Sequence, residues 1–212
     1  MKRLLVIAGI AALMPVGTGC KSSTEDYYPM SVGSTWNTEE YALYGTTLAA
    51  LDTMQTSTTL TKVERQVQLS TGEQALEFSS TTTVHQRFPY DTTYTTTSTS
   101  YVRETGAAIL SYQALNDPTP DTVLALPLTV GKTWHMGDSS IAEAVGQEDV
   151  TVKAGSYQNA WKIKVSTTVL GETMDAYCWY ANHVGQVKTH LEFSVGGYTT
   201  VFHSELVSAD IK

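Results

Sequence analysis

The sequence predicts an all-β protein, folded as a curved antiparallel sheet or an open, partial barrel. From Tyr27 onward, polar and apolar residues alternate in runs rich in Thr, Val, Tyr and Ser, a pattern typical of half-buried strands. Turn-forming residues interrupt these runs at short intervals, as they do in antiparallel sheets. Helical spacing is almost absent, and a short helix fits only over residues 46–54.

The N-terminal residues predict export and attachment to a membrane. Met1-Lys2-Arg3 is basic, and the following apolar run is too short to span a bilayer. The small residues of "VGTGC" end at Cys20 and resemble the bacterial lipoprotein signal, in which this cysteine is acylated. We therefore expect a signal peptide over residues 1–19, lipid on Cys20 and a short polar tether over residues 20–26. Cleavage near the same place by the ordinary signal peptidase is the alternative.

The expected state of the two cysteines, Cys20 and Cys178, depends on whether Cys20 is acylated. If Cys20 carries lipid, Cys178 has no partner, and its apolar context "DAYCWYA" predicts a buried small side chain without thiol reactivity. If Cys20 is not acylated, a Cys20–Cys178 disulfide is expected, because the exported compartment permits it.

Charge and length exclude several classes of function. The formal net charge is −8, and loss of Lys2 and Arg3 with the signal peptide makes the mature chain more acidic still. Such a body repels nucleic acid and anionic lipid headgroups. No later segment approaches the roughly 20 apolar residues of a transmembrane helix. The remaining residues, 27–212, are expected to form a single β domain.

A repeated eight-residue motif occurs at two places in this domain. "PMSVGSTW" covers residues 29–36 and "PLTVGKTW" covers residues 127–134. In each, Val-Gly favours a turn and Trp opens the next strand as a core anchor. The repeat predicts two related β units, 27–125 and 126–212; chance or convergent turn chemistry is the alternative.

The C-terminal residues predict a hairpin whose register can be stated. Gly196-Gly197 suits a two-residue turn, in which Val195 faces Tyr198. This register places Lys188 opposite Glu205 on the solvent face. The core face is expected to hold Val187, Leu191, Phe193, Val195, Tyr198, Phe202 and Leu206.

The same register places His190 opposite His203, with Glu192 beside them. Two imidazoles and a carboxylate can hold Zn²⁺ or Cu²⁺, but a structural zinc site normally uses four protein ligands. A polar hairpin face that contains two histidines explains the pattern as well. We predict no metal and no cofactor.

A second hairpin supplies exposed aromatic residues. A Gly171-Glu172 turn would pair Leu170 with Thr173. Tyr177 and Trp179 then point outward as candidate binding residues, with Lys164 opposite Trp179 at a distance suited to a cation–π contact. The inward face is expected to hold Trp161, Ile163, Val165, Val169, Met174, Ala176, Cys178 and Tyr180.

The segment from Tyr90 to Glu104 consists mainly of Thr, Ser and Tyr. It predicts a long, largely solvated strand that is paired, because it lacks the prolines of a disordered stalk. Motifs of nucleophilic, metal-dependent and nucleotide-dependent catalysis are absent from the sequence. Glu39 and Glu40 are adjacent acids that point to opposite faces of a strand, and we assign both to solvated surface. The sequence therefore predicts a protein that is not an enzyme.

Four segments together resemble a family of uncharacterised bacterial envelope lipoproteins, described as TapB-like or as domains of unknown function. They are "YYPMSVGSTW", "LPLTVGKTW", "VTVKAGSYQNAWKIKV" and "YCWYANHVGQVKT". The resemblance implies a curved antiparallel sheet or partial barrel, wrapped like the periplasmic lipoprotein carriers, and it brings no catalytic residue.

Two functions agree with these observations. The first is an envelope-anchored, non-catalytic module on an outer membrane, facing the periplasm or the cell surface, that docks an envelope protein or glycan through Tyr177 and Trp179. The alternative is a periplasmic carrier of a lipid or other apolar ligand inside the curved sheet. They differ in whether the protein's own side chains fill the inward face. Trp36, Trp134 and Trp161 favour a filled face, and hence the module.

Overall fold

The computed structural model describes residues 25–87, 90–137, 139–169 and 172–212; the predicted signal peptide and Cys20 lie outside them. Within these ranges the chain forms twelve strands and no helix that could cross a membrane. The strands are β1 (Thr35–Gly45), β2 (Leu51–Gln68), β3 (Gln74–Gln86), β4 (Thr92–Glu104), β5 (Ala108–Tyr112), β6 (Asp121–Ala125), β7 (Thr133–Met136), β8 (Ser140–Val152), β9 (Gly155–Val169), β10 (Glu172–Ala181), β11 (Gly185–Val195) and β12 (Tyr198–Asp210).

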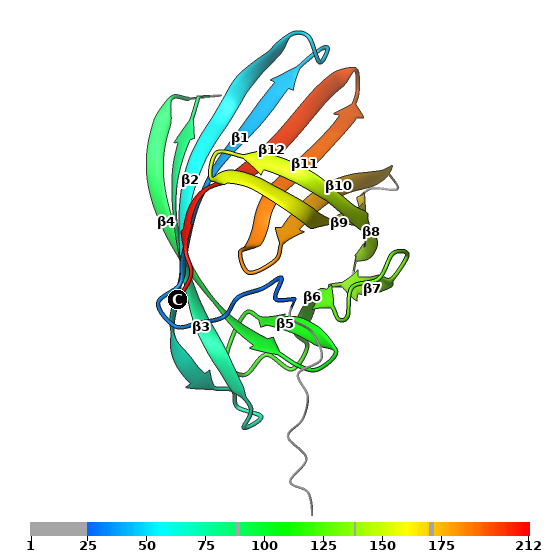
Figure 1. Ribbon diagram of the computed structural model, residues 1–212. Coiled ribbons are helices and arrows are strands. Elements are labelled where there is room, and N and C mark those ends of the chain that lie inside the picture. The colour runs from blue at the N-terminus through cyan, green and yellow to red at the C-terminus, as the bar shows by residue number, and fades with distance from the viewer. Residues whose placement is uncertain (1–24, 88–89, 138, 170–171) are drawn as a thin grey trace, which may run out of the picture.

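All twelve strands belong to one antiparallel sheet that curls into a nearly closed barrel (Figure 1). The order is β6-β5-β4-β3-β2-β1-β12-β11-β10-β9-β8-β7, so each half of the chain is a meander and the halves join where β1 pairs with β12. The edge strands β6 and β7 meet at a seam without being hydrogen-bonded neighbours in the sheet. The predicted all-β fold is confirmed.

One local expectation needs correction. The helix expected over residues 46–54 is absent, because residues 46–50 form the turn of the β1–β2 hairpin and β2 begins at Leu51. The predicted tether over residues 20–26 lies mostly outside the described residues, and its last residue, Asp26, is bonded to the body. The Asp26 backbone N–H donates to the Asn182 side-chain oxygen (2.7 Å), and the His183 N–H donates to the Asp26 carbonyl (2.6 Å). These bonds fix the start of the body against the β10–β11 turn.

The two copies of the repeated motif form equivalent turns with equivalent hydrogen bonds. In the first copy, the N–H of Gly33 donates to the carbonyl of Val63 on β2 (2.8 Å). In the second, the N–H of Gly131 donates to the carbonyl of Ala144 on β8 (2.8 Å). Each copy thus begins the first strand of its half and pairs it with the second. The descent of the halves from related units stays a prediction.

In the described part of the chain, large side chains fill the inside of the barrel at one end. Trp134 and Trp161 are buried there as expected, while Trp36 is half-buried at the border of this cluster. The other buried members of this core are Tyr27, Val63, Phe78, Val102, Ile109, Leu124, Ala142, Ala144, Ile163 and Tyr180.

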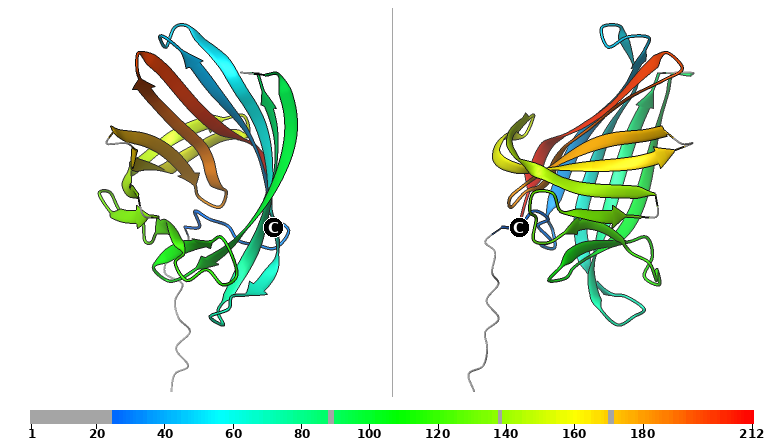
Figure 2. Two further views of the ribbon diagram at one scale, coloured as in Figure 1. Left: turned by 180° about the vertical axis from the view of Figure 1, so that it is seen from behind. Right: turned by 90° about the vertical axis from the view of Figure 1, so that its right-hand side faces the viewer.

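The far end of the β8–β9 hairpin, residues 146–160, folds across the outer surface of the sheet. We call it the β8–β9 arm. The N–H of Ala154 donates to the carbonyl of Leu206 on β12 (2.9 Å), and Lys153 forms ion pairs with Glu39 and Glu205. Figure 2 shows the arm from two further directions. A second cluster of buried residues, which includes Val150, Val152 and Leu206, lies beneath it.

Candidate functional site

One hairpin register is as predicted and the other differs. Val195 faces Tyr198 and His190 faces His203 across the β11–β12 hairpin. In the β9–β10 hairpin, Val169 faces Glu172, so this register differs by two residues from the expected one. A shift by an even number leaves each side chain on its predicted face. It does change partners: Lys162, instead of Lys164, lies opposite Trp179.

Trp179 faces outward as predicted, but the expectation that it is exposed is wrong. Its side chain is 6% exposed because the β8–β9 arm covers it, and its indole N–H donates to a carboxylate oxygen of Glu148 on the arm (2.7 Å). Tyr177 is half-buried beside it, and the Lys162 ammonium lies 5.0 Å from the Tyr177 ring centroid and 5.1 Å from that of Trp179. These two aromatic residues do not form an exposed binding surface.

The histidine pair lies on the outer face near the same arm. The rings of His190 and His203 are 6.0 Å apart, and Tyr41 stacks on His203 at 4.8 Å. Burial, and then the charge of Lys188, lower the pKa of His203. Glu192 is exposed. In the part of the chain that the structure describes, no three His, Cys, Asp or Glu side chains gather as a metal site; the absence of a bound metal stays a prediction.

The inner face beyond the tryptophan-rich core is open. Phe202 and Tyr198, expected in the core, are 43% and 46% exposed. Val187 and Leu206 are buried, but in the cluster beneath the β8–β9 arm and not in the tryptophan-rich core. The β1–β2 and β11–β12 hairpins project beyond the strands opposite them (Figure 1). Among the described residues, the strands opposite therefore do not cover the inner side of these hairpins. Tyr44, stacked on Tyr198 at 5.0 Å, is exposed on the same projection.

A hollow of about 230 Å³ lies where the filled and open parts of the inner face meet. Its closed end is aromatic: Trp36 stacks on Phe78 at 6.2 Å, and Tyr28 lies 6.1 Å from Phe78. The Trp36 indole N–H donates to the carbonyl of Val184 (2.6 Å), which fixes the ring. Burial raises the pKa of Tyr28 to about 12, so its phenol is neutral at physiological pH.

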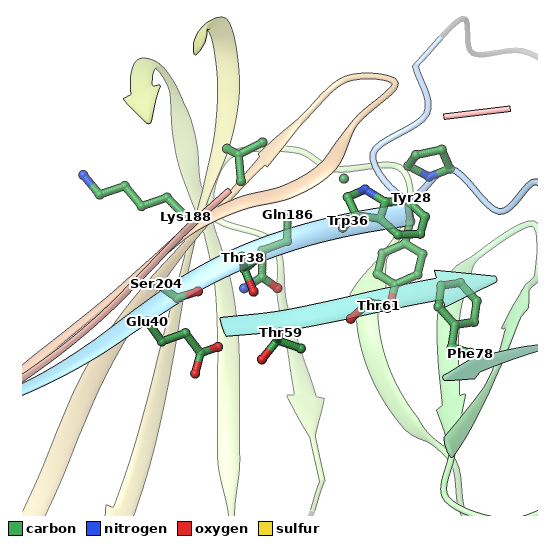
Figure 3. Close-up of a pocket in the computed structure, with 13 residues that line it drawn as sticks. Tyr28, Trp36, Thr38, Glu40, Thr59, Thr61, Phe78, Gln186, Lys188 and Ser204 are labelled. Atoms are coloured by element: carbon green, nitrogen blue, oxygen red, sulfur yellow. The ribbon is translucent and has the colours of Figure 1, made fainter. Parts of the chain in front are cut away.

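The rest of the hollow is polar (Figure 3). Hydroxyl, amide and carboxylate groups line it, contributed by Thr38, Glu40, Thr59, Thr61, Gln186 and Ser204. A second hollow of about 220 Å³ shares Glu40, Gln186 and Ser204 with the first and continues past Phe202 toward the open end. We call the two hollows together the groove.

Glu40 lies where the two hollows meet. It is exposed, and it accepts a hydrogen bond from the buried hydroxyl of Ser57 (3.2 Å). Its pairing with Ser57 and Ser204 places it on the inner face, opposite in direction to Glu39. Among the described residues, the strand registers put no other charged side chain on the inner face of the groove. Glu40 is solvent-exposed, as expected, and the surface to which it belongs is the inner face of the barrel.

A chain of hydrogen bonds continues from the groove to the predicted inward cysteine. The Tyr180 hydroxyl donates to Gln186 (3.2 Å), the Gln186 amide donates to Thr189 (2.6 Å), and the Thr189 hydroxyl donates to the Cys178 sulfur (3.7 Å). Burial raises the pKa of the Cys178 thiol. Cys178 is a free, partly buried cysteine, and its raised pKa disfavours the reactive thiolate.

Sequence reasoning missed the groove, although it contained one usable signal. Trp36, Thr38 and Glu40 alternate along one strand, and Trp36 was expected to point inward. By the period of two, Glu40 points inward as well. The sequence does not predict whether other side chains pack over Glu40, because the strands across the barrel from it are distant in sequence.

Comparison with known proteins supports the fold. A protein from Bacteroides fragilis NCTC 9343, thought to be exported and described as having a YmcC-like fold, superimposes with a TM-score of 0.53 at 14% identity, over 88% of this chain and 99% of that chain. A protein from Parabacteroides distasonis ATCC 8503, thought to be a lipoprotein, gives 0.52 at 15% identity over the same shares. No family model and no curated protein matches the chain, so the TapB-like resemblance stays a prediction.

Proposed function

We propose that the protein is a non-catalytic binding module, anchored in the cell envelope, that holds its ligand in the groove. The observation that carries the proposal is the half-filled barrel. Aromatic side chains pack one end of the inner face, while polar and aromatic side chains at the other end are exposed. A concave, mostly preformed surface with a few convergent polar groups is the usual form of a small-ligand site.

The envelope location rests on the N-terminal sequence and on the kind of protein that shares the fold. The basic start, short apolar run and Cys20 have the form of a lipoprotein signal. The two similar structures are of proteins thought to be an exported protein and a lipoprotein. We expect Cys20→Ser to move the protein from the membrane fraction to the soluble fraction. Unchanged membrane association of this variant would contradict lipidation of Cys20 as the anchor.

A carrier of an amphipathic lipid is the second candidate, favoured by the apolar rim of the open end. Phe202, Tyr198 and Tyr44 are exposed there and could contact an acyl chain. A wholly apolar ligand fits less well deeper in the groove, because it would displace water from the Glu40 carboxylate, whose hydrogen bond from Ser57 leaves other acceptor sites of the carboxylate unused.

Occupancy of the groove can be tested by filling it. The full chain, purified from the envelope, is compared with Thr59→Trp, which places an indole in the groove, and with Thr58→Trp, which adds the same group to the exposed outer face of the same strand. Native mass spectrometry and a solvent extract of each sample measure what co-purifies.

The proposal expects a bound species that Thr58→Trp retains and Thr59→Trp loses. Acyl groups attached to the chain are identified by their covalent mass and are not counted. Equal retention by the two variants, or no bound species in the wild-type chain, would overturn the groove as the binding site.

A further inference from the structure

Building on the proposed function, we infer that the ligand of the groove is a carbohydrate chain without acidic groups, and that Glu40 recognises its hydroxyl or amino groups. Three properties of the groove lead to this class of ligand: its length, the order of its polar and aromatic groups, and its charge.

The length favours an extended ligand. Trp36 and Glu40 lie four residues apart on β1, which corresponds to about 13 Å along a strand. Both line the first hollow, and Glu40 continues into the second. A ligand that reaches both groups must follow the strand direction, as a chain of sugar rings can.

The order of the lining groups matches the two kinds of surface on a sugar. A pyranose ring presents flat C–H faces and an edge of hydroxyl groups. Trp36 and Tyr28 offer aromatic rings at the closed end. Thr38, Thr59 and Ser204 then offer hydroxyls that can donate or accept; Figure 3 shows Thr38 and Thr59 between the rings and Glu40, and Ser204 beside Glu40.

The charge excludes anionic ligands. Glu40 contributes a negative charge. Lys188, the one basic side chain among the described residues that border the first hollow, extends away from it (Figure 3). The Lys188 ammonium lies 5.0 Å from the Trp179 ring centroid, on the outer face. Phosphate or carboxylate groups of a ligand would lie beside Glu40 without a cation in the groove to balance them. Neutral sugars and amino sugars avoid this repulsion.

The experiment measures binding of two defined probes to the full chain purified in detergent. The probes are chitohexaose, which is neutral, and its deacetylated form, the glucosamine hexamer, which is cationic. Isothermal titration calorimetry compares the wild-type chain with Glu40→Gln and with Glu39→Gln. Glu39 is the matched control, because it is adjacent in sequence but points to the outer face and pairs with Lys153. Thermal unfolding of each variant confirms that the fold is retained.

We expect the wild-type chain to bind both probes. Glu40→Gln should weaken the binding of each by about tenfold or more, since hydrogen bonds to a charged acceptor are lost. Glu39→Gln should bind as the wild type does. Only the affinity for the glucosamine hexamer should fall with added salt, because its attraction to Glu40 is electrostatic.

Two outcomes would overturn the inference while leaving the proposed function intact. One is a co-purifying species that Thr59→Trp removes, together with no binding of either hexasaccharide; a retained lipid would then identify a carrier. The other is equal binding by Glu40→Gln and Glu39→Gln. If neither a co-purifying species nor probe binding is found, both proposals fail together.

Discussion

Trp179 is held on the outer face of the sheet by groups from three strands. The Glu148 carboxylate accepts its indole N–H, and the ammonium groups of Lys162 and Lys188 lie over its ring. The period of two predicts the direction of this side chain correctly. The exposure of Trp179 depends instead on residues 146–160, the β8–β9 arm, which cover it. The sequence around Trp179 does not predict that this arm folds across the sheet.

Trp179→Phe should lower the free energy of unfolding by about 1.5–3 kcal/mol. The substitution keeps an aromatic ring but removes a partly buried hydrogen bond to a charged acceptor, and hydrogen bonds to charged groups have this typical value. Urea denaturation measures the change. Lys153→Ala is the comparison: it removes exposed ion pairs of the same arm and should cost about 1 kcal/mol or less. Equal losses in the two variants would contradict the importance of the indole bond.

His203 should make the folded state less stable in acid. Burial and Lys188 lower its pKa in the folded protein, so the unfolded chain binds the proton more readily. Its contribution to stability is therefore present above the ordinary histidine pKa of 6.5 and is lost as the pH falls below that value. Tyr41 and His190 pack against the ring, and Glu205 partly opposes the shift.

A proton NMR titration of His203 should give a pKa below 6.5. His203→Gln should lose less stability between pH 7 and pH 5 than the wild type does. A His203 pKa at or above the ordinary value would contradict the prediction, as would an unchanged pH dependence in the variant.

At the scale of elements, the alternation of polar and apolar residues predicts the face of the sheet on which a side chain lies. It predicts the pairing register of two strands less well. The Gly196-Gly197 turn and the pairing of His190 with His203 follow from the sequence. In the β9–β10 hairpin, a register shifted by two residues keeps every side chain on the same face, so the apolar pattern is equally satisfied. Polar contacts distinguish the two registers: the actual one brings Asp175 opposite Ser166, whose hydroxyl donates to the Asp175 carboxylate.

The repeated turns at Gly33 and Gly131 should respond equally to substitution. Their φ angles are +91° and +80°, in the region that side chains other than glycine rarely adopt. Gly33→Ala and Gly131→Ala should each destabilise the protein by about 1–3 kcal/mol. Gly106→Ala is the control, since Gly106 has open space around it and no positive φ. Thermal or urea unfolding measures all three, and markedly unequal effects at the two turns would contradict their equivalence.

At the scale of the whole molecule, the sequence predicts an all-β body but not how far its inside is filled. Trp36, Trp134 and Trp161 predict a filled inner face; Trp134 and Trp161 do fill one end, and Trp36 lies at its border. The other end is open because the β1–β2 and β11–β12 hairpins are longer than the wall opposite them (Figure 1). Whether a hairpin extends beyond the strands across the barrel depends on how the whole sheet curls. It cannot be predicted from any single segment of the sequence.

The barrel has two places where its halves meet, and they differ in kind. β1 pairs with β12 over the whole length from Thr35 to Gly45. At the other junction, β6 and β7 are short edge strands that lie side by side without a shared ladder. Backbone N–H and C=O groups at the seam that are not paired in a β-ladder bond to water or form irregular contacts. Local opening of such a region costs less free energy than the opening of paired strands does.

Hydrogen exchange should therefore separate the two junctions. We expect amides of Thr35–Gly45 and Tyr198–Asp210 that lie in the β1–β12 ladder to exchange slowly, near the rate set by global unfolding. Amides of Asp121–Ala125 and Thr133–Met136 that face the seam should exchange much faster, because local opening exposes them. Mass spectrometry of peptic fragments over a series of exchange times measures both sets in one sample. Slow exchange throughout β6 and β7 would show that a hydrogen-bonded ladder closes the barrel in solution.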